Sequence, residues 1–384
     1  MKRRDFLRTL AAAGAAGAAI APQGMPTARA SHESVAHRGR REDRPPHITW
    51  TIFSRHIQWL TTQAYSHANP YETGLLIGEK AQEIGFKAVD LTVRSTGHVD
   101  PNLADVGVNL PMMVKGVRSA GAICRHITTN IELPDEPVAT FNGNPVFPED
   151  LLRVAQDVGI EIYRWGGFSY NTQPDPNTNE PQPFGEQVLE QLQAFAKAVK
   201  PLAKLNQKYG VTAIYHSSSG GNGPRSVWDL VHILKDVDPD ELAINFDIGH
   251  MVRESTLSAW RTNVRYAMPH IRGVGLKDGA VVRNTNGTVG GSFPLAGTGM
   301  VQWREFFQLL RQGGYHGPAE AQYEYNVVGL QGANVSLNTT FWADHARFVD
   351  GNLTPAFMTE ELKKDITYYK NQAALAGWMP GELT

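Results

Sequence analysis

Cysteine is nearly absent from this sequence: Cys124 is the only one among 384 residues. A single thiol excludes an intramolecular disulfide, and because Cys124 lies in an apolar stretch we expect a core residue and not a nucleophile. The chain also lacks an apolar run long enough to span a membrane. It has no glycine-rich P-loop or GxGxxG motif, so we expect no nucleotide cofactor.

Residues 1–30 have the organisation of an export signal. Arg3-Arg4 precedes a short Ala/Gly-rich apolar stretch, and Ala28-Arg29-Ala30 has the A-x-A pattern of a cleavage site. The arginine pair resembles a Tat signal, which implies export by the Tat machinery to the periplasm or beyond, without stable membrane insertion. Residues 31–46 are polar and end in proline, so we expect a disordered tether.

Excess positive charge is also missing. The first thirty residues carry five of the 36 Lys and Arg and one of the 38 Asp and Glu. The rest of the chain therefore has 31 basic and 37 acidic residues, a formal charge of −6. A mildly acidic protein of this kind is not expected to bind nucleic acid.

Short apolar runs alternate with longer amphipathic segments through residues 47–384. Strands alternating with helices indicate parallel βαβ units, and eight such units predict a single (β/α)8 barrel of the α/β class. The expected strands are 47–54, 88–94, 122–129, 161–166, 212–218, 242–249, 271–277 and 318–325. Helical patterns include 72–84, 185–209, 226–236, 255–267 and 302–313.

Ionisable residues stand at the end of every predicted strand. Barrel enzymes build their sites from the carboxyl ends of the strands, so we expect these side chains to gather on one face. In chain order they are Arg55-His56, Arg94 with His98, His126, Arg164, His216, Asp247 with His250, Lys277-Asp278, and Glu324. Arginine suits carboxylate or phosphate groups, and we assign substrate binding to Arg94, His98, His126, Arg164 and Trp165.

Several segments together resemble the xylose isomerase-like TIM barrels, a superfamily of sugar isomerases, epimerases and related lyases. They are "FDIGHM" (246–251), the Lys277-Asp278 strand end, "GTGMVQW" (297–303) and "GPAEAQYEY" (317–325). Four more segments resemble an exported subgroup labelled sugar phosphate isomerase/epimerase. They are "AVDLTVRSTGHVDP" (88–101), "ITT" (127–129), "YRWGGFSY" (163–170) and "YHSSSG" (215–220).

The resemblance implies a metal site that this sequence keeps only in part. Metal-using members hold one divalent ion with two Glu, one Asp and one His. Asp247 matches the Asp, Glu324 matches the last Glu, and His250 matches a nearby substrate-contacting His. His216 stands where the other Glu is expected, and Gly275 stands where the ligating His is expected.

Two interpretations of this altered site stay open. Asp247, Glu324 and His216 could hold one divalent ion (Mn, Zn, Fe, Co or Mg) on a face of two carboxylates and one imidazole. Alternatively, Lys277 replaces the cation and polarises a carbonyl itself. The catalytic candidates are Glu324, Lys277, His250 and His216. Loss of one carboxylate leaves a one-sided site, which suits an elimination or an aldose–ketose shift with a single base.

Two long segments are expected to act at the same end of the barrel. Residues 171–184 are rich in proline and asparagine and could form a lid, and the length of 279–299 indicates a functional loop. Tyr323 and Tyr325 should point away from Glu324, into the core or the helix layer.

The leading functional hypothesis is a periplasmic isomerase, epimerase or lyase that transfers a proton beside the carbonyl of a sugar or oxidised sugar. The main alternative is a non-catalytic sugar-binding protein that has lost its standard ligands. An AP-endonuclease-like enzyme would need a trinuclear metal cluster and a basic face, neither of which the sequence indicates. A glycosidase using Glu324 with Asp247 stays open. Such barrels often pair, so a homo-oligomer also stays open.

Overall fold

The computed structural model of the chain describes residues 44–171, 186–217, 223–255, 259–283, 285–328, 334–336 and 354–384. Residues Glu42–Thr384 form one compact unit. The expected export signal, nearly all of the expected tether and residues 172–184 of the expected lid lie outside the described residues. Among the residues that are described, none of the helices is both apolar and long enough to cross a bilayer.

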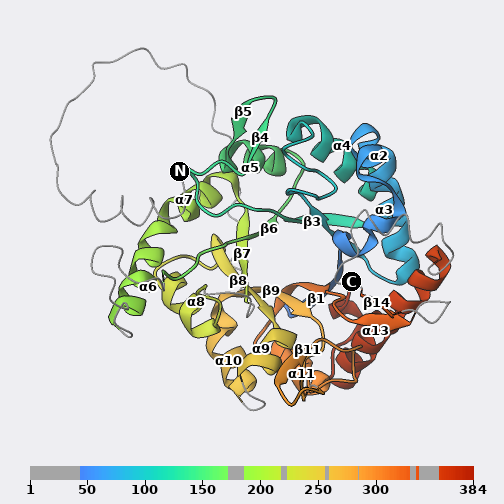
Figure 1. Cartoon of the computed structure of the whole chain (residues 1–384), viewed down its shortest axis with the longest axis vertical. Coiled ribbons are helices and arrows are strands. Elements are labelled where there is room, and N and C mark those ends of the chain that lie inside the picture. The colour runs from blue at the N-terminus through green and yellow to red at the C-terminus, as the bar shows by residue number, and fades with distance from the viewer. Residues whose placement is uncertain are drawn as a thin grey trace. The chain divides into compact units, whose positions relative to one another are not determined.

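Eight parallel strands close into a barrel, with helices around them (Figure 1). The order around the barrel is β1-β12-β9-β8-β7-β6-β3-β2. The strands are β1 (His47–Phe53), β2 (Ala88–Thr92), β3 (Ile123–Thr128), β6 (Ile162–Trp165), β7 (Thr212–His216), β8 (Leu242–Asp247), β9 (Ile271–Leu276) and β12 (His316–Ala321). This confirms the prediction of a single (β/α)8 barrel, and all eight predicted strands are present.

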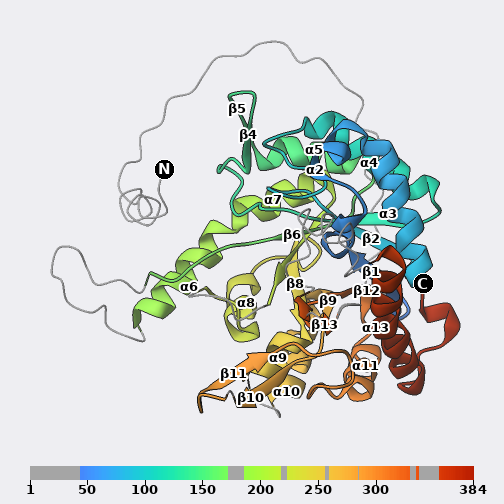
Figure 2. The same ribbon diagram turned by 45° about the vertical axis from the view of Figure 1, so that its right-hand side comes forward.

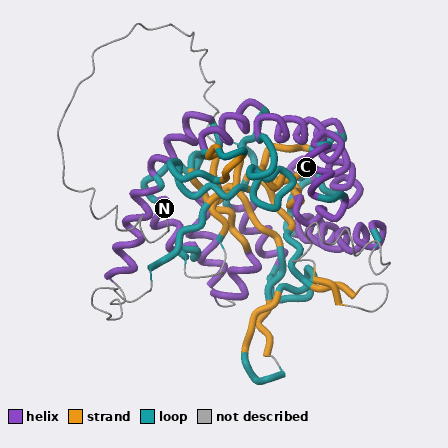
Figure 3. The backbone as a smooth tube through the Cα atoms, turned by 45° about the horizontal axis from the view of Figure 1, so that its top comes forward, coloured by secondary structure: helices purple, strands orange, loops and turns teal. Residues whose placement is uncertain are grey.

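Helices surround the strands, as Figure 3 shows in purple around orange. The α-helices are α2 (Gln63–Ala68), α3 (Pro70–Ile84), α4 (Val106–Ser119), α5 (Pro148–Asp157), α6 (Glu186–Ala198), α7 (Lys200–Tyr209), α8 (Val227–Leu234), α9 (Ile248–Ser255), α10 (Ala259–Ala267), α11 (Trp303–Gln312) and α13 (Pro355–Leu375). Short 3-10 helices cover Ser54–Leu60, Met268–His270 and Pro380–Glu382.

The described residues also form three small antiparallel two-stranded sheets. They are β4 (Ala139–Phe141) with β5 (Asn144–Val146), β10 (Ala280–Arg283) with β11 (Val289–Ser292), and β13 (Asn326–Val328) with β14 (Asn334–Ser336). Figure 2 shows the β10–β11 hairpin beside α9. This hairpin belongs to the long segment 279–299, which follows β9 directly.

The sequence pattern explains why these elements form. β7 and β8 are buried at every position, as expected for parallel strands covered on both faces. In α11, Trp303, Phe306, Phe307 and Leu310 recur at helical spacing and are buried, so one face of the helix packs on the barrel.

Two predicted boundaries were wrong, one because of a proline and one because of a long-range contact. The helix expected over 185–209 is divided into α6 and α7, because Pro201 lies in the first turn of α7 and has no N–H to continue α6. The eighth strand, expected over 318–325, ends at Ala321. Beyond it the Tyr323 N–H donates to Nε2 of His56 (3.1 Å) and not to a neighbouring strand, so Glu324 lies after the strand.

Candidate functional site

Lys277, which follows β9, lies between two carboxylates at the carboxyl end of the barrel. Its Nζ is 2.7 Å from Oε1 of Glu324 and 3.2 Å from Oδ2 of Asp247. Lys277 also donates to Oε1 of Gln322 (3.3 Å). The Lys277 and Asp247 side chains are 2% and 0% exposed, whereas that of Glu324 is 20% exposed. The result is a buried ammonium whose outer partner, Glu324, reaches solvent.

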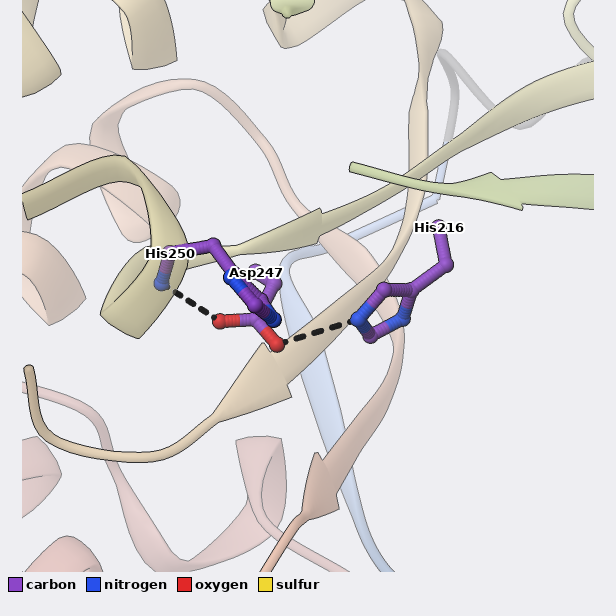
Figure 4. Close-up of side chains that lie close together, drawn as sticks. All are labelled: His216, Asp247 and His250. Atoms are coloured by element: carbon purple, nitrogen blue, oxygen red, sulfur yellow. Dashed lines mark hydrogen bonds and ion pairs between the residues drawn. The ribbon is translucent and has the colours of Figure 1, made fainter. Parts of the chain in front are cut away.

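Asp247 is held from several sides because it ends β8 and precedes α9. Its Oδ1 accepts from the His250 N–H in the first turn of α9 (3.0 Å), as a helix-capping carboxylate does. Its own N–H donates to Oγ of Ser217 (2.9 Å), and Nε2 of His216 is 3.1 Å from its Oδ2. Figure 4 shows His216 and His250 on either side of the carboxylate. The orientation of Asp247 is therefore fixed before any substrate arrives.

The charges at this site are set by burial and by neighbouring groups. Burial alone would raise the pKa of Asp247, but Lys277, His250 and His216 together lower it below its usual range. Burial and the nearby Arg164 lower the pKa of His216 to about 3, so its imidazole is neutral. Nδ1 of His216 lies 3.2 Å from Nδ2 of Asn245, an amide donor, which leaves the proton on Nε2 to face Asp247.

Two glycines make room for this arrangement. Gly275 pairs with Asp247 across β8 and β9, and a Cβ at Gly275 would lie 3.0 Å from Oδ2 of Asp247. A Cβ at Gly249 would lie 2.5 Å from the carbonyl oxygen of Lys277, closer than real contacts allow. A histidine at position 275 would therefore crowd the carboxylate that Lys277 now contacts.

The side chains at this site fit an ammonium better than a metal ion. Two groups in the described part of the chain offer metal-ligand atoms within 4.8 Å of one another: His216, Asp247 and His250 here, and Asp90, His126 and Glu320 elsewhere. A metal held by both Asp247 and Glu324 would need oxygens at roughly 2.0–2.2 Å, in the place where the Lys277 ammonium contacts both. The ligand set of Asp247, Glu324 and His216 therefore does not fit a bound ion while Lys277 lies between the carboxylates.

Two arginines lie on the opposite side of the barrel. Arg164 is in β6 and Arg94 follows β2, and both are half-buried. Arg94 lies over the ring of Phe53 (5.7 Å), and in the described residues neither guanidinium makes an ion pair or a side-chain hydrogen bond. Burial, and then the charges of Arg164 and Arg55, lower the pKa of Arg94 to about 10. These guanidinium groups are free to receive an anionic group.

Three other predicted substrate-binding residues do not join Lys277. His98 is 1% exposed, and its Nδ1 lies 3.0 Å from Oγ of Ser54. Trp165 is 3% exposed and meets Phe168 and Tyr215 edge to face, so it presents no open ring face. His126 is two residues before the end of β3 and belongs to the buried group with Asp90 and Glu320.

The structure adds a residue that the sequence did not single out, and it gives Asp278 a role. Phe293, in the segment 279–299, packs its ring 4.4 Å from Nζ of Lys277 and edge to face with His250 (4.8 Å). Asp278 fastens this segment, because its carboxylate accepts from the N–H groups of Gly297 (2.9 Å) and Val301 (3.0 Å). Only the length of the segment indicated a role; nothing in the pattern identified Phe293.

The two tyrosines beside Glu324 lie as expected. Tyr323 is fully buried and donates to the carbonyl oxygen of Leu362 in α13 (2.8 Å). Tyr325 is 7% exposed. Glu324 thus faces Lys277 while both of its neighbours in the chain pack away from it.

Comparison with known proteins places the fold in a family. The family model described as "xylose isomerase-like TIM barrel" matches residues 79–339. The D-allulose 3-epimerase from Methylomonas sp. is 13% identical, with 85% of this chain and 98% of that chain covered and a TM-score of 0.51. L-Ribulose 3-epimerase is 14% identical, with 85% and 95% covered and a TM-score of 0.51. No curated protein matches the chain. Identities this low establish the fold alone.

Proposed function

Because the chain belongs to the xylose isomerase-like TIM barrel family, we propose that it is a carbohydrate-active isomerase or lyase that moves a proton beside a carbonyl. The observation that carries this proposal is the position of Lys277 between Asp247 and Glu324 at the carboxyl end of the barrel. Family membership supplies the substrate class, a sugar or oxidised sugar, and the side chains supply the chemistry.

Each side chain has a role that follows from its contacts. The Lys277 ammonium polarises the substrate carbonyl and stabilises the enediolate oxygen that forms when the neighbouring carbon loses a proton. Glu324, the more exposed carboxylate, takes that proton. Asp247 holds the Lys277 ammonium in place. Glu324 then returns the proton to the former carbonyl carbon, while the hydroxyl proton of the neighbouring carbon passes to the former carbonyl oxygen, which completes an aldose–ketose shift. In an elimination, Glu324 instead gives the proton to the oxygen that leaves the β carbon as the carbonyl reforms and a C=C bond is made.

A single base favours isomerisation or elimination over epimerisation. Epimerisation requires a second group to deliver a proton from the opposite face of the carbon. His216 occupies the corresponding strand end, but both of its ring nitrogens have protein neighbours, Asp247 and Asn245. It is therefore a positioning residue for Asp247 and not a second base.

The unpaired arginines favour a sugar that carries an anionic group. Arg94 and Arg164 are half-buried and could bind a carboxylate in bidentate fashion. A sugar acid has its carboxylate several bonds away from the carbonyl that reacts. Binding of the anion on the β2–β6 side would thus leave the carbonyl on the Lys277 side.

We predict that incubation in D2O with a panel of aldoses, ketoses and uronates will place deuterium at one substrate carbon, with uronates turned over faster than neutral sugars. Nuclear magnetic resonance and mass spectrometry of the sugars measure this exchange. The Glu324→Gln variant serves as the control for adventitious exchange. Saturable sugar binding without any exchange would contradict the enzyme and support the non-catalytic sugar-binding protein.

We further propose that the chain is exported through its twin-arginine signal. Replacing both Arg3 and Arg4 with lysine should leave the uncleaved precursor in the cytoplasm, because the Tat machinery requires the arginine pair. Fractionation followed by immunoblotting measures the distribution. Normal export of the double-lysine variant would contradict a Tat signal.

A further inference from the structure

A second group of ionisable side chains lies inside the barrel, separated from Lys277 by the side chain of Gln322. Asp90 in β2, His126 in β3 and Glu320 in β12 are 0%, 4% and 1% exposed. Each offers a ligand atom, and these atoms lie within 4.8 Å of one another. We refer to these three residues as the inner cluster. Two carboxylates buried together, away from water, are costly unless an opposite charge or a proton compensates them.

Each carboxylate of the inner cluster has one oxygen satisfied and one oxygen without a partner. The Thr128 hydroxyl donates to Oδ2 of Asp90 (2.6 Å), and Nε2 of Gln322 donates to Oε1 of Glu320 (3.0 Å). In the part of the chain that the structure describes, Oδ1 of Asp90, Oε2 of Glu320 and both ring nitrogens of His126 have no hydrogen-bond partner. In metal sites, a donor that hydrogen-bonds one oxygen of a carboxylate commonly orients the other oxygen toward the cation.

The spacing of the inner cluster also calls for a compensating charge. Two carboxylates whose ligand atoms lie within 4.8 Å of each other, out of water, repel each other unless a cation or a proton lies between them. His126 offers a ring nitrogen to the same group, and its Nε2 lies 3.8 Å from Oδ2 of Asp90. Arg94 and Arg164 lie nearby, but in the described residues neither is within ion-pair distance of these carboxylates.

We propose that Asp90, His126 and Glu320 bind one divalent transition-metal ion inside the barrel, at a site separate from Lys277. Two carboxylates and one imidazole form a face that suits Mn²⁺, Fe²⁺, Co²⁺ or Zn²⁺. The ion ties together three strands, β2, β3 and β12. One dication accepts a lone pair from each of the three side chains, so each of them gains the partner that it lacks.

The inner cluster is joined to the Lys277 site through one amide. Gln322 donates to Glu320 with Nε2 and accepts from Lys277 with Oε1. Ligation of Glu320 therefore fixes the rotamer of Gln322 and, through it, the position of the Lys277 ammonium. The ion is a structural neighbour of the reactive site and takes no direct part in the proposed proton transfer.

The first experiment measures metal binding by the full chain, purified without a metal-binding tag and stripped with a chelator. Zn²⁺, Mn²⁺ and Co²⁺ are titrated separately, with metal content by mass spectrometry, melting temperature and the visible d–d absorption of Co²⁺. Wild type should bind one ion per chain and become more stable. Glu320→Gln and Asp90→Asn should each bind at least about 100-fold more weakly.

Two control variants test whether the ion binds at the inner cluster and nowhere else. Asp365→Asn changes another buried carboxyl, whose pKa is raised to about 7 by burial, and should bind metal like wild type. Asp247→Asn changes the Lys277 site and should also keep the ion. Loss of the ion in Asp247→Asn, with retention in Glu320→Gln, would overturn the proposal.

The metal-free proteins distinguish misfolding from loss of a ligand. Without metal, Glu320→Gln should be at least as stable as wild type, because it removes a repulsive carboxylate from Asp90. A proton shared between Asp90 and Glu320 is the competing hypothesis for the cluster. If wild type binds none of the three metals and only its stability changes around neutral pH, the shared proton accounts for the cluster and the metal site is wrong.

Discussion

Replacing Lys277 with methionine is expected to lower the free energy of unfolding by about 3–5 kcal/mol and to abolish turnover. The reason is that Asp247 is fully buried and would lose the ammonium 3.2 Å from its Oδ2. Removing one partner of a buried pair leaves an uncompensated charge, which costs far more than the pair contributes when both are present. Urea denaturation at neutral pH measures the loss.

The double variant Asp247→Asn/Lys277→Met is the matched control. Because it removes both charges, it should recover most of the stability that Lys277→Met loses, while staying inactive. A loss of less than about 1 kcal/mol in Lys277→Met would contradict the geometry at this site. Lys277→Arg tests position: the charge stays, but a wider group cannot meet Asp247, Gln322 and Glu324 in the same way.

The effect of Lys277→Met should depend on pH in a defined direction. The pKa of Asp247 lies below its usual range, so the stabilisation is complete above the pKa of an unfolded aspartate, about 3.9. It declines as the pH falls further, toward the lower pKa of the folded state. The difference in the free energy of unfolding between wild type and Lys277→Met should therefore be largest at neutral pH and become smaller in acid.

Replacing Glu324 with glutamine is expected to lower kcat by about 10²–10⁴-fold, with a change in the free energy of unfolding below about 1 kcal/mol. The glutamine carbonyl still accepts from Lys277, and the Glu324 side chain is partly exposed, so the fold loses little. What disappears is the basic carboxylate that takes the proton. Deuterium exchange into the substrate and urea denaturation, measured on the same preparation, separate the two effects.

Glu324→Asp keeps the carboxylate but withdraws it by one methylene. It should retain partial exchange activity, more than Glu324→Gln, if the carboxylate is the base. Equal activity in wild type and Glu324→Gln would show that another group takes the proton. In that outcome the ion pair with Lys277 has only a structural role, and the proposed mechanism is wrong.

The sequence alone was sufficient to predict the barrel and the end of the barrel at which Lys277 lies. Eight apolar runs separated by amphipathic segments specify parallel βαβ units, and parallel strands end on one face of a closed barrel. Because Asp247 ends β8 and Lys277 follows β9, the two strand ends bring them together whatever the details of the loops. Their contact follows from topology and short-range pattern alone.

The position of Glu324 depended on a contact that no local pattern reveals. The run 318–325 has strand character throughout, but β12 stops at Ala321 because the backbone of Tyr323 bonds to His56, 267 residues earlier in the chain. Trp165 is a second example. Its place in the sequence suited a sugar-stacking ring, but packing by Phe168 and Tyr215 buries it.

The inner cluster is the part that only the tertiary structure decided. β2 is buried at all five positions, so the usual alternation of buried and exposed residues does not tell which side chains face the barrel interior. A carboxylate at Asp90, inside an otherwise apolar strand, was a signal, but its partner Glu320 lies in the last strand of the barrel, far away in sequence. Closing the barrel sets the shear between strands, and that geometry alone determines that Asp90, His126 and Glu320 meet.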